Sequence, residues 1–311
     1  MLCYRLRLLQ KNGGTTPWHS DTLWGQLCWI YRDLRGDSDL SDLLQESKTG
    51  NVPFVVSDGF PTGFLPMPAG GSYVSKTSVT ATKAQGIEQI NAGKRFKKMC
   101  YLPESHFNMI VQGEKISLEY ASQPADEIIG FQTHNSVARD SNTVLDGSLY
   151  QLQWLQPGGN GKLDVYVLVR EDFEETLWEC FDYMARYGFG GKVSIGLGAF
   201  DVLEKTSFCF PTIACPNCFI TLSRCTPSHD MPINGQYKLS LKYGKLWHNR
   251  SRQGEPFKKP IVQLEPGAIF WGAIPEDGYC GCLVEGVAFD YPDTVQCGLS
   301  IAIPAKIEEV E

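Results

Sequence analysis

The sequence predicts an α+β fold in which alternating strands and helices are followed by a second, β-rich part. An apolar alternation at Leu2–Leu9, helical spacing over Leu23–Leu34 and a strand signal at Phe54–Val56 give the β-α-β order of a ferredoxin-like unit. Strand, turn, strand, helix and a glycine-rich loop complete the first part. From Thr206 onward, strand signals recur between Pro and Gly clusters, with little helical periodicity.

The length of 311 residues suits two domains, which we place at 1–204 and 205–311. No run of about 18 apolar residues is present, so we expect no membrane span. The first ten residues alternate as a strand does and do not resemble a signal peptide. We therefore expect a cytoplasmic protein.

The first part contains two segments with special roles. Ser20 and Asp21 have the chemistry of helix-capping groups ahead of Leu23–Leu34. Residues 72–98 are polar and basic without periodicity, which predicts an insertion that projects from the domain. The other expected elements are a short helix at Asp39–Gln45, strands within Tyr101–Tyr120, a polar loop at Gln132–Thr143, strands at Ser148–Trp154 and Leu163–Arg170, and an amphipathic helix at Glu171–Tyr187.

The second part is expected to be built from strands. The candidates are Cys218–Leu222, Tyr237–Tyr243, Pro260–Leu264, Ala268–Trp271, Cys282–Val287 and Gln296–Ile303.

Tyr187–Phe200 holds five glycines around Lys192 and Ser194, and we expect the rest of the chain to be organised around it. A backbone rich in glycine, with free N–H groups and one cation, is suited to phosphate. The segment lacks the Gly-Lys-Ser/Thr of a Walker loop, and its helix-then-strand order is the reverse of a dinucleotide fingerprint. Phosphate contact and a plain helix C-cap followed by a kinked strand at Val193–Val202 both remain open.

The net charge of −7 is unusual for a nucleic-acid binder, but the charges are clustered. Lys76–Lys115 has a net charge of +4 and Gln236–Pro260 of +6, whereas Glu276–Glu311 has −7. This distribution suits a protein that contacts a polyanion on one side and proteins on another, although solvated loops explain either basic run alone.

Cysteines and histidines supply only weak signals for metal or catalysis. Of the eleven cysteines, Cys215 and Cys218 have the spacing of one zinc knuckle, but a structural zinc needs four ligands. We therefore expect no metal and no cofactor. His19 is a candidate general base for RNA cleavage, or else a structural or RNA-contacting residue. Its neighbours Ser20 and Asp21 cannot complete a triad, whose members are close in space rather than adjacent in sequence.

Several stretches together resemble the RAMP superfamily of CRISPR proteins. GFGGKVSIGLGAFDV, beginning at Gly188, is similar to the superfamily's glycine-rich loop (G-loop, residues 188–198). HSDTLWGQLCW at His19–Trp29, HNSVARDSNT with GSLYQ at His134–Gln151, and Tyr237–Leu246 with KKPIVQLEPGAIF at Lys258–Phe270 resemble the Csm subunit-four family, a Cas-five-like group of type III-A effector complexes. Ala268 stands where serine is commoner in that family.

This resemblance implies two ferredoxin-like (RRM-like) domains with an inserted thumb hairpin, and a non-catalytic subunit. The implied partners are the 5′ handle of the guide crRNA, the large polymerase-like subunit (Cas ten), a backbone RAMP subunit and, indirectly, target RNA. The alternative is a metal-independent repeat-RNA endoribonuclease of the Cas-six-like or Cas-five-d-like kind, with His19 as base.

The resemblance and the residue chemistry together predict a set of RNA contacts. They lie in the opening loop, on or near the thumb, in the central loop and in the G-loop. The predicted contacts are Trp18, His19, Ser20, Lys94, Arg95, Lys97, Lys98, His134, Asn135, Arg139, Gly190, Gly191, Lys192, Ser194, Gly196 and Gly198.

Overall fold

A four-stranded antiparallel path forms the centre of the first part, in a computed structural model that describes residues 1–70, 73, 94, 98–116, 122–246 and 254–309. The path runs β2-β8-β1-β9, and every neighbouring pair is antiparallel. The strands are β1 (Leu2–Gln10), β2 (Phe54–Val56), β8 (Lys162–Val169) and β9 (Phe200–Ser207), with the short β3 (Phe60–Pro61) also paired to β8. Helix α1 (Ser20–Arg35) follows β1, and α6 (Glu174–Tyr187) follows β8. This is the order predicted for a ferredoxin-like unit.

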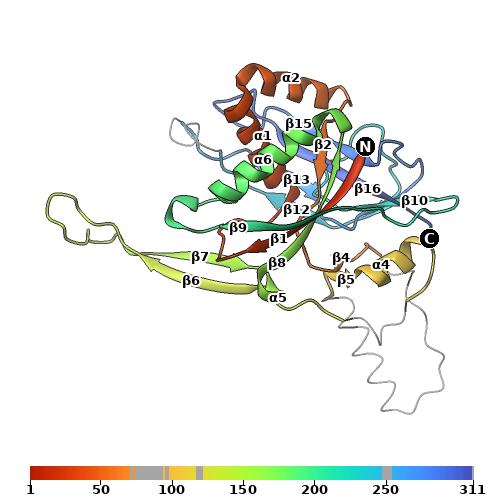
Figure 1. Cartoon of the computed structure of the whole chain (residues 1–311), viewed down its shortest axis with the longest axis horizontal. Coiled ribbons are helices and arrows are strands. Elements are labelled where there is room, and N and C mark those ends of the chain that lie inside the picture. Colours follow the sequence, from red (N-terminus) through yellow and green to blue (C-terminus); the bar gives the residue numbers. More distant parts are fainter. Residues whose placement is uncertain (71–72, 74–93, 95–97, 117–121, 247–253, 310–311) are drawn as a thin grey trace, which may run out of the picture.

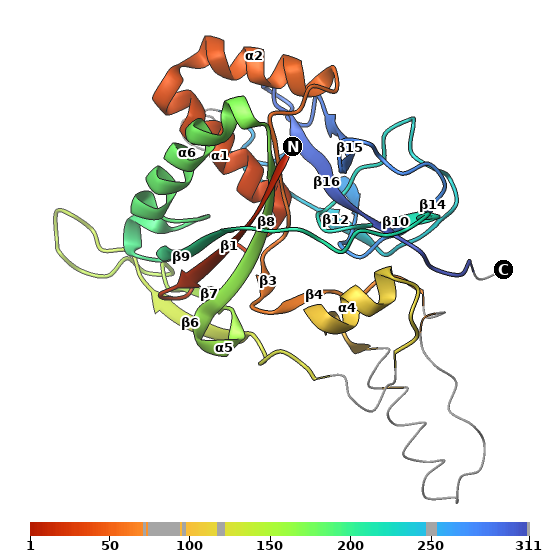
Figure 2. The ribbon, with the colours of Figure 1, turned by 45° about the vertical axis from the view of Figure 1, so that its right-hand side comes forward.

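The sequence of β8 explains its central place. Its residues are buried from Leu163 through Val169, as expected for a strand covered on both faces. Helices α1 and α6 lie together over one face of the sheet, with α2 (Asp37–Lys48) above them (Figure 2). The apolar stripe of α6, which includes Leu177, Phe181 and Met184, is buried in the core.

The second part is built from strands, as predicted. A five-stranded sheet has the order β11-β14-β10-β16-β15. Its strands are β10 (Cys218–Thr221), β11 (Gly235–Gln236), β14 (Ile269–Trp271), β15 (Tyr279–Val284) and β16 (Gln296–Ala305), and β12 (Leu239–Lys242) pairs with β13 (Ile261–Leu264) beside them. After Ser207 the described residues contain no helix. A second ferredoxin-like domain is therefore not confirmed, which fits the lack of helical periodicity there.

The two parts share one hydrophobic core. Buried side chains of the first sheet and of α1 join Ile220, Leu299 and Ile301 in a single cluster. Strand β9 also continues to Ser207, past the boundary that we placed after residue 204. The described residues thus pack as one body, with no gap in the packing at 204/205. The domain boundary there stays a prediction from the sequence.

Segments between β2 and β8 differ most from the prediction. Over residues 101–116, the described part of Tyr101–Tyr120, the expected strands give only the short β5 (Tyr101–Pro103), paired with β4 (Phe64–Pro66). Helix α4 (Glu104–Val111) follows, with its apolar face buried. The expected polar loop from Gln132 instead begins inside a strand: β6 (Ile128–His134) pairs with β7 (Tyr150–Gln156), and the hairpin reaches away from the body (Figure 1). A four-residue turn, α5 (Gly158–Gly161), leads on to β8. Most of the expected insertion at 72–98 lies outside the described residues.

Polar contacts at the start of α1 connect the two parts. Asp58 accepts a hydrogen bond from the Ser20 amide at 2.8 Å and from the Arg224 amide at 3.3 Å. The fully buried carboxylate of Asp21 pairs with Lys242 and accepts a hydrogen bond from Gln296. Ser20 and Asp21 were predicted to cap the helix, but the helix begins at Ser20 itself and Asp58 binds its first amide. The reason is that both residues are committed to the second part.

We expect Asp21→Asn to lower the free energy of unfolding by about 3 kcal/mol, because it leaves Lys242 without its buried counter-charge. Asp201→Asn is the matched control, since its pair with Lys11 is exposed on both sides and should contribute less than about 0.5 kcal/mol. Urea unfolding of the full chain measures both. Equal effects of the two substitutions would contradict this account.

Candidate nucleic-acid interface

The G-loop is a compact turn between α6 and β9, and left-handed glycines set its shape. Gly188, with φ of 101°, ends the helix, and its amide bonds Met184 O at 2.7 Å. Lys192 is itself left-handed, with φ of 64°, and precedes the short turn η3 (Val193–Ile195). The strand expected from Val193 begins only at Phe200, so the first half of that prediction is wrong.

Residues 12–16 pack against the G-loop and form hydrogen bonds with it. The Gly198 amide donates to Gly13 O at 2.9 Å, and the Gly191 amide donates to Thr16 Oγ1 at 3.0 Å. A Cβ at Gly198 would lie 2.1 Å from Phe189 O, so only glycine fits this crossing. The Gly190 amide is buried and bonds Gln26 Oε1 at 2.9 Å. Gly190, Gly191 and Gly198, three of the predicted RNA contacts, therefore use their amides inside the protein.

Three consecutive amides behave differently. Among the described residues, no acceptor lies within hydrogen-bonding distance of the N–H groups of Lys192, Val193 and Ser194. Lys192 and Ser194 are exposed and Val193 is half-buried. Successive N–H groups after a left-handed residue form a concave nest that suits an anion. We call Lys192–Ser194 the amide nest.

The root of the β6–β7 hairpin lies against the same region. Gly14 and Leu155 exchange two backbone hydrogen bonds of 2.8 Å. The Trp154 ring lies over Gly13 and Gly130, where an added Cβ would come within 2.5 Å and 2.1 Å of it. These glycines bring the hairpin close enough to continue the G-loop surface.

An aromatic row extends from the amide nest along the hairpin. The Lys192 ammonium lies 5.9 Å from the centroid of the Tyr150 ring, which is 44% exposed. Tyr150 stacks on His134 with centroids 5.5 Å apart and an interplanar angle of 16°. His134 Nε2 is buried and has no hydrogen-bond partner among the described residues. The structure thus brings the predicted residues Lys192 and His134 together through Tyr150, which sequence reasoning missed.

Two residues of the opening loop are core residues rather than surface contacts. Trp18 is 7% exposed, stacks on Phe189 at 4.0 Å and donates to Gln10 Oε1 at 2.7 Å. Its ring faces are therefore covered, and it cannot stack on a base in this conformation. Ser20 is 1% exposed, and its hydroxyl accepts the Arg224 amide. The predictions of RNA contact for Trp18 and Ser20 do not fit the structure.

His19 is half-buried against the second part. Its Nε2 lies 3.0 Å from Arg224 Nη2, and because a guanidinium only donates, the imidazole accepts. Burial, helped by the charges of Arg224 and Lys242, lowers the pKa of His19. A neutral imidazole has a single ring lone pair, and here Arg224 occupies it. This geometry does not suit a general base.

The remaining predicted contacts are spread over the surface. Asn135 and Arg139 are exposed in the loop at the far end of the hairpin (Figure 1). Gly196 is exposed at the edge of the G-loop. Lys94 and Lys98 are exposed near the expected insertion, whereas Arg95 and Lys97 lie outside the described residues.

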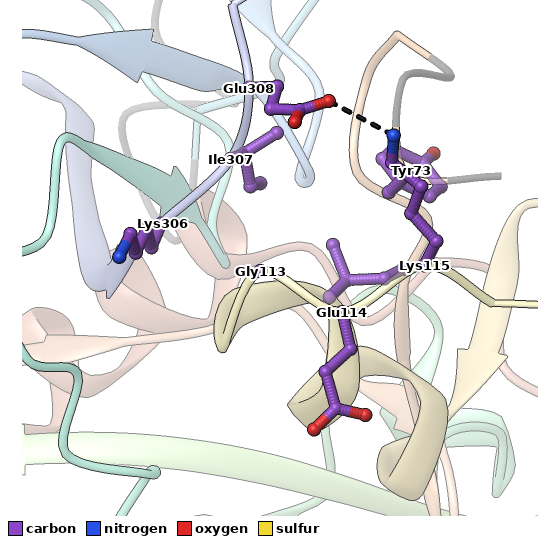
Figure 3. Close-up of a pocket in the computed structure, with 8 residues that line it drawn as sticks. Tyr73, Gly113, Glu114, Lys115, Lys306, Ile307 and Glu308 are labelled. Carbon is purple, nitrogen blue, oxygen red and sulfur yellow. Dashed lines mark ion pairs between the residues drawn. The ribbon is translucent and has the colours of Figure 1, made fainter. Parts of the chain in front are cut away.

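Neither the cysteines nor the cavities indicate a metal or small-molecule site. Cys218 is buried and its thiol donates to Ala305 O at 3.5 Å, while Cys215 is exposed. The described residues contain no group of three or more metal-ligating side chains. One cavity, of about 20 Å³, lies between Tyr73 and Ile307 beside the Lys115–Glu308 ion pair (Figure 3); it has room for about one water. None of the described helices is both long and apolar enough to cross a bilayer.

Comparison with solved structures covers the whole chain. A chain of the Csm1-Csm4 cassette in complex with AMPPNP matches with a TM-score of 0.62 and 17% identity over 100% of both chains. The same cassette with cA4 gives 0.62 and 16%, over 99% of this chain and 100% of the other. The Csm3-Csm4 subcomplex of the type III-A CRISPR-Cas interference complex gives 0.58 and 14%, over 96% and 99%. Csm4 is the component that these structures share.

The chain has the fold of Csm4. The predicted resemblance to that RAMP family is thereby confirmed at the level of the fold. No protein-family model matches the sequence, and a search of curated proteins finds no similar sequence. At these identities the Csm4 likeness fixes the architecture, and the function has to be argued from the interface itself.

Two glycines of the G-loop make a matched test of its packing. Gly196→Ala should cost about 1–2 kcal/mol, because φ is 88° but an added Cβ meets nothing within 4 Å. Gly198→Ala should cost at least twice as much, because the Cβ would also collide with Phe189 O. Thermal and urea unfolding measure the difference. Equal losses of stability would contradict the close contact between Gly198 and Phe189 O.

Proposed function

We propose that this Csm4-like chain is a subunit of a type III CRISPR effector complex and binds the 5′ handle of the guide RNA. The observation that carries the proposal is the amide nest: the adjacent amides of Lys192, Val193 and Ser194 have no acceptor among the described residues, whereas every other amide of the G-loop is hydrogen-bonded. A rigid loop with unused donors is prepared for an anionic ligand without reorganisation. The Csm4 fold makes a guide-RNA phosphate the fitting anion.

The chemistry of the nest suits backbone contact. Main-chain amides and one lysine bind phosphate oxygens and fix the register of the strand, but do not read the bases. Ser194 adds a hydroxyl that can donate to phosphate or accept from a ribose 2′-hydroxyl. A repeat-derived handle has a constant sequence, so a grip that does not depend on the bases is sufficient there.

The aromatic row gives the adjoining nucleotide a place to stack. Tyr150 is 44% exposed beside Lys192, and its ring stacks on His134. An unpaired base stacks well on such a ring. The unpaired Nε2 of His134 supports a further hydrogen bond to the nucleotide if the hairpin shifts on binding.

The projecting β6–β7 hairpin fits the role of the thumb. It is inserted between β2 and β8 and carries only Arg139, Asp140 and Asp146 as charged residues. Ile129, Phe131 and Leu149 are largely exposed on it. An apolar projection of this kind can separate or unstack bases, and its exposed apolar side chains offer no group that binds phosphate. We therefore place the thumb here rather than at 72–98.

The proposed subunit is non-catalytic and acts by assembly. Its partners are the large polymerase-like subunit and the backbone subunit, in line with the Csm1 and Csm3 that accompany Csm4 in the solved structures. It touches target RNA only through the guide. The occupied lone pair of His19 gives no support to the endoribonuclease alternative.

Lys192→Glu should weaken binding of guide RNA and reduce the slope of log affinity against log salt by about one unit, because one phosphate contact is lost. Lys205→Glu, on the far part of β9, is the control of equal charge change. Filter binding in EDTA over a series of salt concentrations measures both, and the recovered RNA should be uncleaved. An unchanged slope for Lys192→Glu would count against the nest.

Tyr150→Ala should lower the affinity for guide RNA by about 1–3 kcal/mol through the loss of one stacked base. Tyr183→Ala removes a tyrosine of similar exposure from α6 and should have no effect. Replacing Tyr150 by Phe should preserve binding, since the ring and not the hydroxyl does the stacking. If Tyr150→Phe binds as poorly as Tyr150→Ala, the stacking role is wrong.

A further inference from the structure

The outer face of β12 presents a stripe of large apolar side chains to solvent. Tyr237, Leu239, Leu241 and Tyr243 occupy alternate positions and are between 48% and 65% exposed. Val262, directly opposite Leu241 in the β12–β13 register, is 55% exposed. The stripe lies on the second part of the chain. It is distant from the amide nest in sequence and belongs to a different sheet from β9, which follows the nest.

Within β12 (Leu239–Lys242) the inner side chains are polar, and both are bonded. Ser240 accepts a hydrogen bond from Arg224 at 2.5 Å, and Lys242 pairs with the buried Asp21. In a half-buried strand the apolar side normally faces the core and the polar side faces water. In β12 the apolar side faces water and the polar side faces the core. Because the inner residues are held by specific partners, a shift in strand register does not explain the exposed stripe.

The strand also has a free edge. Within the described residues, β12 pairs with β13 only, and the two form a separate two-stranded sheet. An exposed apolar edge is a site for pairing with another chain. Alternate side chains on an edge strand match the alternate side chains of an added extended segment.

Lysines border the stripe. Residues 237–246 and 254–265 hold five lysines and two glutamates. Lys238, Lys245 and Lys259 are exposed and form no ion pair with any carboxylate that the structure describes; Lys245 and Lys259 lie over Phe257 and Phe289 instead. Facing copies of this surface would bring like charges together, which disfavours self-association. Tyr237 and Tyr243 end the stripe, but its centre at Leu239, Leu241 and Val262 is aliphatic and fits apolar side chains better than bases, which favours protein over RNA.

We propose that the outer face and free edge of β12–β13 dock an extended segment of another protein whose side chains alternate between apolar and acidic. Its apolar side chains cover Leu239, Leu241 and Val262, and its carboxylates meet Lys238, Lys245 and Lys259. That this protein is another subunit of the same effector complex rests on the function proposed above.

The test uses the full chain co-expressed with the other proteins of its locus and a guide RNA, with a benzophenone amino acid at Leu241. Irradiation should join Leu241 to an apolar-acidic segment of another subunit, identified by mass spectrometry. Leu241→Glu should weaken retention of that subunit about tenfold or more, as for the centre of an interface, and leave guide RNA bound. The control Leu203→Glu alters an exposed leucine on β9 and should change neither.

The charge chemistry has its own readout. Lys238→Glu with Lys259→Glu should slow association and remove most of its salt dependence, because rim charges act mainly on the on-rate. Circular dichroism and thermal melting confirm that each variant is folded. An unchanged on-rate and salt dependence would overturn the acidic part of the proposal.

The remaining outcomes separate the two proposals. Retention of every subunit by Leu241→Glu, a crosslink to RNA, or a crosslink to a second copy of this chain overturns the docking surface and leaves the guide-RNA role intact. A wild-type chain that crosslinks to an apolar-acidic segment but carries no RNA supports the docking surface and overturns the guide-RNA role. A wild-type chain that retains neither protein nor RNA overturns both.

Discussion

The structure of the interface depends on one close crossing of backbones, where Gly198 passes Phe189 and donates to Gly13. No side chain fits there, and the G-loop and residues 12–16 are joined by this main-chain bond and by side-chain bonds from Asn12, Thr15 and Thr16. Together with the bonds inside the loop and to Gln26, this interlock leaves only the amides of Lys192–Ser194 without an acceptor among the described residues of the G-loop. The crossing also places Gly14 beside Leu155, so the base of the β6–β7 hairpin lies next to the G-loop. The amide nest and the aromatic row are therefore consequences of the same crossing.

Local patterns predicted the elements that burial and periodicity determine. β1, α1, β2, β8 and α6 all form where the apolar spacing placed them, as do most strands of the second part. The strand expected at Cys282–Val287 begins earlier, as β15 at Tyr279–Val284, and the short β11 was not predicted. The failures occur where tertiary partners decide. Glu104–Val111, within the expected strand region, becomes helix α4 because Phe107, Ile110 and Val111 bury one face against the core. The strand expected at Ser148–Trp154 forms as β7, shifted by two residues, but its partner β6 was missed because the pair buries little surface and shows no core-facing pattern.

The candidate site was predictable only in part for a related reason. Glycine spacing predicts the G-loop, and residue chemistry predicts Lys192 and His134 as contacts, but not that the two lie close together. Which amides stay unpaired depends on Thr16 and Gln26, residues far from the loop in sequence. Tryptophan is a residue type that stacks on bases, and only the contacts of Trp18 with Phe189 and Gln10 show that it belongs to the core. The pairing of Gln132–His134 with Tyr150–Leu152 in one hairpin could have indicated Tyr150. Residues directly opposite each other in a hairpin share a face, and Tyr150 is opposite His134.

The acidic composition of the chain is compatible with binding a polyanion because the proposed grip uses dipoles more than charges. Peptide N–H groups in a nest attract phosphate without contributing to the formal charge of −7. Lysines are instead gathered around the β12–β13 stripe, where the aliphatic centre fits protein better than RNA. A basic run in this sequence is thus a poor guide to the RNA surface. The separation is physically reasonable: a rigid set of amides fixes the position of a constant RNA end, while apolar area rimmed by lysines supplies the affinity and orientation that a protein contact needs.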